Sequence, residues 1–319
     1  MTKPTAVIDK SLFHEICKLP AKETRDSIWK ALTGKYQIVV PLIMVEEVLV
    51  NIVRPGEIPP QDIEMMVSDV LQLQPCWIDD VFEYAFRELV QRQPFEKPVA
   101  PPAELLQRLL AAKSNDPELI KWVEERKPAR KATATQWIAE QKKLVPATGF
   151  YVVKNEQEFF EEAVKMAFFC HLDDPQKKQD MLETILGETF RFRHPDAIQK
   201  IDMAFAHYGK DTFKSFPFTF NCLTVWFAYF LAPIFQIQTA SDSEPRMILK
   251  PGRPDQDNNL ADLQYVVSAL ICDRLLTRDK GMRNIASIFQ ANQRWRGQTI
   301  FFVPIKGKDL SSQIPAFLV

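Results

Sequence analysis

The chain has 319 residues, of which 46% are hydrophobic and 25% are charged, and its formal net charge is -1 at pH 7. This composition is close to the globular average, and it excludes a chain whose overall charge draws it to nucleic acid or to a membrane surface. The length indicates one large domain or two domains of moderate size. Nucleic-acid binding would therefore have to come from local clusters of charge in the sequence.

The cysteines give no sign of a zinc site or of a disulfide framework. They lack any C-x-x-C or Cys/His pairing and are scattered along the chain at Cys17, Cys76, Cys170, Cys222 and Cys272. The N-terminus has no secretory apolar region, and the most apolar run, residues 221–235, is short for a bilayer and contains Pro233. We therefore expect a cytoplasmic protein without a membrane segment, and we interpret that run as a buried helix.

The chain begins with a short apolar run, Thr5 to Asp9, that ends in a carboxylate. This pattern predicts a strand, followed by a helix that is capped near Ser11 and by further helix that reaches about Leu32 and is stopped by Gly34. Residues 36–40 form a second continuous apolar run before Pro41, which is typical of a parallel strand covered on both faces.

Residues 42–53 show the spacing of a helix that is almost entirely apolar apart from Glu46 and Glu47. One of these two acids should face inward. Because a connection between neighbouring parallel strands is nearly always right-handed, the two N-terminal strands should lie side by side with their carboxyl ends at the same edge.

The middle of the chain has helical periodicity almost throughout, with loops rich in Pro and Gly between the helices. The helices that we predict there span residues 62–73, 81–90, 103–113, 156–172 and 197–207. We therefore predict an α/β domain with a parallel sheet flanked by helices, formed by residues 1–55 and 250–319. A large all-α insertion, residues 56–249, would interrupt it.

The C-terminal part returns to alternating elements. We predict an amphipathic helix over residues 259–272, a buried strand over 274–277, a second helix from Met282 and a last strand over 299–303. Asp262 then lies in the first turn of one helix, and Asp279 follows the carboxyl end of a strand, where open α/β sheets carry functional groups.

Acidic side chains should consequently meet at one edge of the sheet: Asp9, Asp262, Asp279 and either Glu46 or Glu47. Carboxylates gathered in this way repel each other unless a cation neutralises them, and hard oxygen ligands select Mg²⁺ or Mn²⁺. Such ions can activate water and stabilise the charge on a phosphodiester. Each acid taken singly has a simpler explanation as a helix-start, turn or solvated residue, although this is weaker for Asp9 at the end of a central strand.

Three motifs together resemble the PIN domain, a metal-dependent nuclease fold of parallel strands and helices. They are Val7-Ile8-Asp9-Lys10-Ser11-Leu12, the segment from Val40 to Val48, and Asp262 followed by Thr277-Arg278-Asp279. The resemblance covers only the two terminal pieces of the chain. It implies that Asp9, Glu47, Asp262 and Asp279 are catalytic metal ligands, with Glu47 preferred to Glu46, and that Ser11 and Thr277 support them.

The resemblance also implies a function. Most members that this chain resembles act on RNA, and many are bacterial toxins held by an antitoxin, so we expect a Mg²⁺- or Mn²⁺-dependent endoribonuclease with RNA and an antitoxin as partners. A structure-specific DNA nuclease is the alternative with the same chemistry. The alternative from a different class is a non-catalytic PIN-like scaffold whose insertion binds a protein partner. The protein could form an oligomer in each case.

Local positive charge gathers between Lys121 and Lys143, with Trp122 and Trp137 among the basic residues. Such a segment could follow a phosphate backbone and stack bases. The candidate contacts to nucleic acid are Lys127, Arg130 and Lys131. The alternative is an exposed helical face with its tryptophans in the core. We expect the aromatic residues between Phe216 and Phe230 to form the core of the insertion.

Overall fold

The structure is a computed structural model. It describes residues 3–53, 60–78, 81–91, 138–144, 149–167, 195–208, 221–249, 258–290 and 298–301, and short pieces at 107, 117–118, 120–121, 124–125, 135, 173–174, 176–177 and 180–181. The elements up to residue 91 are β1 (Thr5–Ile8), α1 (Lys10–Cys17), α2 (Lys22–Lys35), β2 (Gln37–Pro41), α3 (Leu42–Val53), α4 (Pro60–Gln72), β3 (Cys76–Ile78) and α5 (Val81–Gln91). The later elements are β4 (Tyr151–Val153), α8 (Glu156–Ala167), α10 (Ala197–Tyr208), α12 (Asn221–Leu231), η1 (Ala232–Ile234), β5 (Phe235–Ile237), β6 (Arg246–Met247), α13 (Asn258–Ser268), η2 (Ala269–Ile271), β7 (Arg274–Thr277), α14 (Lys280–Gln290) and β8 (Gln298–Phe301).

The main sheet has five parallel strands in the order β3-β2-β1-β7-β8. Its central strand is β1, in which Val7 pairs with Val39 of β2 on one side and with Leu275 of β7 on the other. Ala6, Val7 and Ile8 are fully buried, as expected for a strand that is covered on both faces. The predicted parallel α/β architecture is therefore confirmed.

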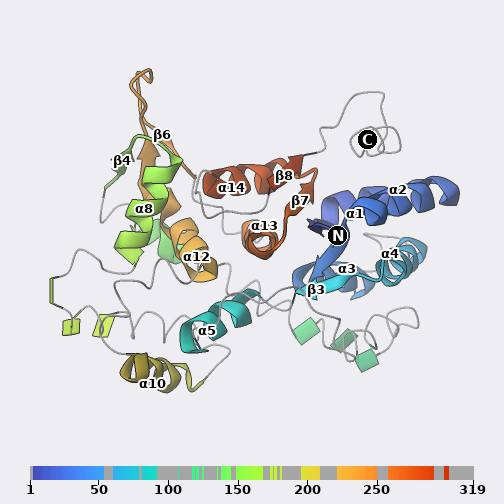
Figure 1. Ribbon diagram of the computed structural model, residues 1–319, viewed down its shortest axis with the longest axis horizontal. Coiled ribbons are helices and arrows are strands. Elements are labelled where there is room, and N and C mark those ends of the chain that lie inside the picture. The colour runs from blue at the N-terminus through green and yellow to red at the C-terminus, as the bar shows by residue number, and fades with distance from the viewer. Residues whose placement is uncertain are drawn as a thin grey trace.

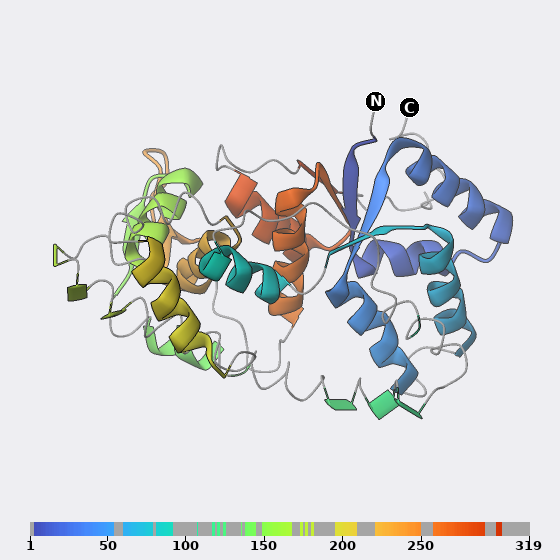
Figure 2. The same ribbon diagram turned by 60° about the horizontal axis from the view of Figure 1, so that its bottom comes forward.

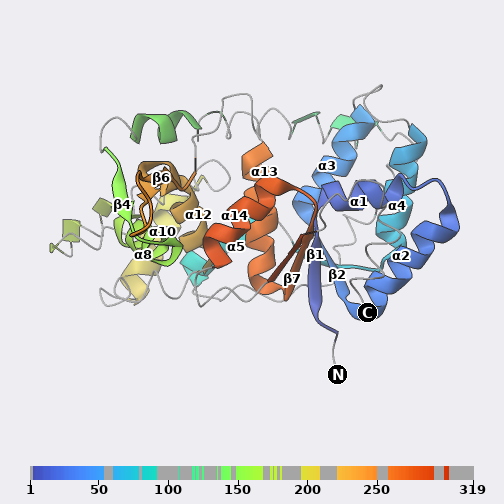
Figure 3. The ribbon, with the colours of Figure 1, turned by 90° about the horizontal axis from the view of Figure 1, so that it is seen from above.

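Helices cover both faces of this sheet. Figures 2 and 3 show α1 to α4 on one side of the strands and α13 with α14 on the other. The helix α1 packs against β7 and α4, and α14 packs against β8 and α13. This layering brings the first and the last quarter of the chain together around β1.

The helical segment predicted after Asp9 forms two helices, and Gly34 does not end the second one. The break falls between Cys17 and Lys22, where Pro20 lacks a backbone donor and disfavours helical geometry in the preceding residue. Gly34 lies inside the last turn of α2, which continues to Lys35. The prediction treated Gly34 as a helix stop, but the helix ends where the extended Tyr36 leads into β2.

The strand β3 was not predicted from the sequence. It pairs in parallel with β2, with Val40 opposite Trp77, and so extends the main sheet into the segment assigned to the insertion. The predicted boundary at residue 55 thus separates two strands of one sheet. The helix α4 also belongs to this layer, since it packs against α1 and α3.

A second sheet makes the expectation of an all-α insertion wrong. Its strands have the order β4-β5-β6, with β4 parallel and β6 antiparallel to β5. The apolar run at residues 221–235 is helical only to Leu231, passes through η1 at Pro233 and then enters β5. A short apolar run suits a buried strand as well as a helix, which is why periodicity missed this strand.

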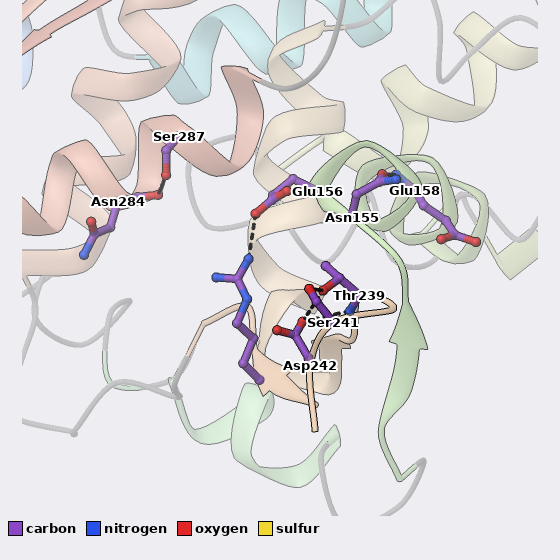
Figure 4. Close-up of polar contacts among 9 residues, drawn as sticks. Asn155, Glu156, Glu158, Thr239, Ser241, Asp242, Asn284 and Ser287 are labelled. Carbon is purple, nitrogen blue, oxygen red and sulfur yellow. Dashed lines mark hydrogen bonds and ion pairs between the residues drawn. The ribbon is translucent and has the colours of Figure 1, made fainter. Parts of the chain in front are cut away.

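The second sheet and its helices form a layer beyond α13 and α14, on the left in Figure 1. Asn155 caps α8, since its Oδ1 accepts the Glu158 N–H at 2.9 Å (Figure 4). Arg246 of β6 donates to Glu156 of α8 at 3.3 Å, which ties the strand to this helix. The helix α12 packs against α8, α5 and α13, so the second layer contacts the main one.

In the part of the chain that the structure describes, every helix is too short or too polar to cross a bilayer. Three predicted elements lie wholly or partly outside the described residues: the helix at 103–113 apart from residue 107, the end of the helix at 156–172 from residue 168, and the end of the strand at 299–303 from residue 302.

Candidate active site

Asp9 joins the first strand, the first helix and a distant strand. Its carboxylate is fully buried, and it caps α1 because Oδ1 accepts the Leu12 N–H at 2.7 Å. Its Oδ2 accepts hydrogen bonds from the Ser11 hydroxyl at 2.8 Å and from the Thr277 hydroxyl. The supporting positions that the sequence indicated, Ser11 and Thr277, therefore both contact Asp9.

Asp279 has the same relation to β7 that Asp9 has to β1. It follows the strand and caps α14, with Oδ1 accepting the Met282 N–H at 2.9 Å. Its own N–H donates to the Thr277 hydroxyl oxygen at 2.9 Å. Because β1 and β7 are parallel neighbours, Asp9 and Asp279 lie at the same edge of the sheet.

The other two acids come from helices. Asp262 lies about one turn into α13 and is half-buried, and no described residue donates a hydrogen bond to its carboxylate. Glu47 of α3 accepts a hydrogen bond from the buried Tyr265 hydroxyl of α13 at 2.7 Å. This bond fixes Glu47 against the helix that carries Asp262.

Gly281 locates two of the carboxylates relative to one another. A Cβ atom added to this residue would lie 3.0 Å from Asp279 Oδ1 and 3.5 Å from Asp262 Oδ2. Asp262 and Asp279 therefore border the same small space at the start of α14.

The acids influence each other electrostatically. Burial, followed by the charges of Asp279, Glu47 and Asp9, raises the pKa of Asp262 to about 8. Burial also raises the pKa of Asp9 to about 6, against the opposing effect of its hydrogen bonds from Thr277, Leu12 and Ser11. The charges of Asp279, Glu47 and Asp9 therefore all reach Asp262, although only Asp262 and Asp279 border one common space.

The carboxylates of this site are ligands that a hydrated divalent cation prefers, but they are not placed to coordinate one directly. Among the described residues, no three His, Cys, Asp or Glu side chains stand close enough to hold one metal ion as they are placed. Asp262 nevertheless combines a raised pKa with a carboxylate that no described donor satisfies. Mg²⁺ keeps several waters and uses few carboxylates, so these residues fit such an ion through its waters.

Two tyrosines near the acids were missed by the sequence reasoning. Tyr265 is one turn beyond Asp262, and this spacing could have indicated that both face the site. Burial, followed by the charge of Asp262, raises the pKa of Tyr229 in α12. Nothing in the sequence signals this proximity, because Tyr229 and Asp262 are far apart along the chain. The helix α12 therefore reaches the acidic edge.

Arg278 supplies a partly buried positive charge beside the acids. It lies between Thr277 and Asp279 and pairs with Glu15 of α1, while its side chain is only 14% exposed. Burial lowers the pKa of Arg278, and Asp9 opposes this shift. The pair links α1 to the loop after β7 beside the acidic edge.

The candidate nucleic-acid contacts Lys127, Arg130 and Lys131 lie outside the described residues. Of the same basic segment, Lys121 pairs with Glu125 at 4.0 Å and Lys143 with Glu140 at 2.7 Å, both at exposed positions. The aromatic core predicted for the insertion is confirmed where it is described, since Trp226, Phe227 and Tyr229 are buried.

Comparisons of the chain with protein-family models, with curated proteins and with solved structures found no match.

Proposed function

We propose that the chain is a PIN-like, divalent-metal-dependent nuclease that hydrolyses phosphodiester bonds, with RNA as its substrate and the cytoplasm as its location. The observation that carries this proposal is that Asp9 and Asp279 follow two neighbouring parallel strands at one edge of the sheet, where Asp262 borders the same space as Asp279. The charges of Asp9 and Glu47 also reach Asp262. Retaining so many like charges at one edge costs stability, which is typical of functional sites.

The proposed roles follow from the contacts. Asp9, Glu47, Asp262 and Asp279 would hold Mg²⁺ or Mn²⁺, directly or through water. When bound, such an ion makes water a better nucleophile and neutralises charge on the phosphodiester. Thr277 and Ser11 keep Asp9 ionised and oriented by donating hydrogen bonds to it, and Tyr265 orients Glu47 in the same way.

The test uses a labelled pool of structured RNA and a pool of single-stranded DNA, each with Mn²⁺, Mg²⁺ or EDTA. Wild type is compared with Asp9→Asn and Asp279→Asn, and Asp202→Asn, an exposed acid of α10, is the matched control. We expect metal-dependent cutting of RNA by wild type and by Asp202→Asn, and none by the other two variants. Cutting of DNA alone would identify a DNA nuclease instead.

A second candidate is a non-catalytic scaffold that binds a protein partner such as an antitoxin. This alternative is favoured by the spacing of the described acids, because no three of them are close enough to coordinate one metal ion. The same experiment separates the two functions. A folded wild type that binds neither Mn²⁺ nor Mg²⁺, and that cuts neither pool, supports the scaffold and overturns the nuclease.

A further inference from the structure

Gly281 occupies a position where any side chain would enter the acidic edge. It lies in the first turn of α14, and an added Cβ would approach Asp279 Oδ1 to 3.0 Å and Asp262 Oδ2 to 3.5 Å. The first of these distances is shorter than most contacts that real Cβ atoms make. A methyl group here would therefore push the Asp279 carboxylate by a few tenths of an ångström and would lie in van der Waals contact with Asp262, in the space between the two carboxylates.

The backbone gives no reason for a glycine at this position. Gly281 is helical, whereas Gly149 is the described glycine that has a positive φ, of 69°. Within a helix, alanine is favoured over glycine because it loses less conformational entropy on folding. The space beside the two carboxylates is what distinguishes Gly281 from an ordinary helical residue.

We propose that Gly281 keeps the space between Asp262 and Asp279 open for a hydrated divalent cation, and so acts as a positioning residue. This inference rests on the proposed function of the same site. A methyl group can neither coordinate a cation nor hydrogen-bond its water, and Asp279 cannot retreat freely, because its Oδ1 also caps α14 through the Met282 N–H. Adding one methyl group should thus weaken cation binding without removing any carboxylate.

The experiment compares Gly281→Ala with Gly34→Ala in the full chain. Gly34 is a matched control because it is also helical and an added Cβ there would meet nothing within 4 Å. Mn²⁺ binding is followed by the electron paramagnetic resonance signal of the free ion, at a temperature where circular dichroism shows that each variant is folded. We expect Gly34→Ala to bind like wild type and Gly281→Ala to bind about tenfold more weakly or worse.

Asp279→Asn distinguishes failure of this inference from failure of the proposed function. If Asp279→Asn loses Mn²⁺ binding while Gly281→Ala binds as tightly as Gly34→Ala, the role of Gly281 is wrong and the metal site stands. If wild type and Asp279→Asn bind Mn²⁺ alike, or neither binds it, both the metal site and the role of Gly281 are wrong.

Discussion

The hydroxyl of Thr277 donates a hydrogen bond to the buried carboxylate of Asp9, although 268 positions separate the two residues. The same hydroxyl oxygen accepts the N–H of Asp279 at 2.9 Å, so one side chain connects the residues that follow β1 and β7. Thr277 is itself fully buried. This arrangement makes Thr277 a structural link as well as a support for the acids.

Replacing Thr277 by Val removes the hydroxyl while it keeps the shape of the side chain. We expect the free energy of unfolding to fall by about 1–3 kcal/mol, because the buried Asp9 carboxylate loses a donor. The pKa of Asp9 should rise further for the same reason. Urea denaturation measures the first effect, and Thr277→Ser, which retains the hydroxyl, is the control; equal stability of the Val and Ser variants would contradict the prediction.

The Tyr265 hydroxyl and Glu47 form a pair that can be tested with a double-mutant cycle. We expect Tyr265→Phe and Glu47→Gln each to weaken Mn²⁺ binding, and the double variant to be weakened by less than the sum of the two. A coupling free energy of about 1–2 kcal/mol would agree with a hydrogen bond to a charged group. Strictly additive effects would mean that Tyr265 does not act through Glu47.

The stability of the metal-free protein should decrease as pH rises. The pKa of Asp262 is about 8 in the folded protein against an ordinary value of 3.8, so between these values the folded state holds a proton that the unfolded chain has lost. Each such proton changes the free energy of unfolding by about 1.4 kcal/mol per pH unit. Asp9 contributes with the same sign up to about pH 6. Urea denaturation in EDTA at pH 4.5, 6 and 8 measures the slope.

Asp262→Asn should consequently stabilise the metal-free protein at pH 8 while abolishing its response to metal. The expected gain is about 2–5 kcal/mol relative to wild type, because the buried repulsive charge is removed, and it should vanish near pH 4. Asp202→Asn should show no such gain. A loss of stability in Asp262→Asn at pH 8 would mean that this carboxylate has a stabilising partner.

Asp69 holds the helices of one layer together, away from the acidic edge. Its Oδ2 accepts the Trp29 indole N–H at 2.9 Å and the Cys17 thiol at 3.3 Å, and so joins α4 to α2 and α1. Asp69→Ala should lower the free energy of unfolding by about 1–3 kcal/mol, since the buried Trp29 N–H is left without an acceptor. Urea denaturation measures this loss. Asp69→Asn, which keeps an oxygen acceptor for the Trp29 N–H, should lose less stability than Asp69→Ala. Equal losses in the two variants would mean that the charge of Asp69, rather than its hydrogen bond, stabilises the fold.

The central part of the main sheet could be predicted because local pattern and tertiary environment agree there. β1, β2 and β7 are continuous apolar runs, and the helices after β1 and β7 begin at Asp9 and Asp279, which cap them. The position of each acid follows directly from this alternation of strand and helix. For that reason the sequence predicts the positions of Asp9 and Asp279 more directly than those of the other two acids.

The remaining features depend on contacts that no local pattern records. β3 has only three residues, and its strand geometry comes from pairing with β2. The hydrogen bond that Glu47 accepts comes from the hydroxyl of Tyr265, which is 218 positions away. Nothing in the sequence distinguishes Gly281 from an ordinary loop or helix residue, because its position between the Asp279 and Asp262 carboxylates is a tertiary feature.

The order of strands in the main sheet also has a consequence during translation. β1 is paired on one side by β2, but its other partner, β7, leaves the ribosome nearly two hundred residues after β3. At ordinary elongation rates this delay lasts roughly 10–40 seconds. Throughout that interval the apolar edge of β1 is open in the nascent chain, so the newly made N-terminal segment can pair wrongly with other chains until β7 is made.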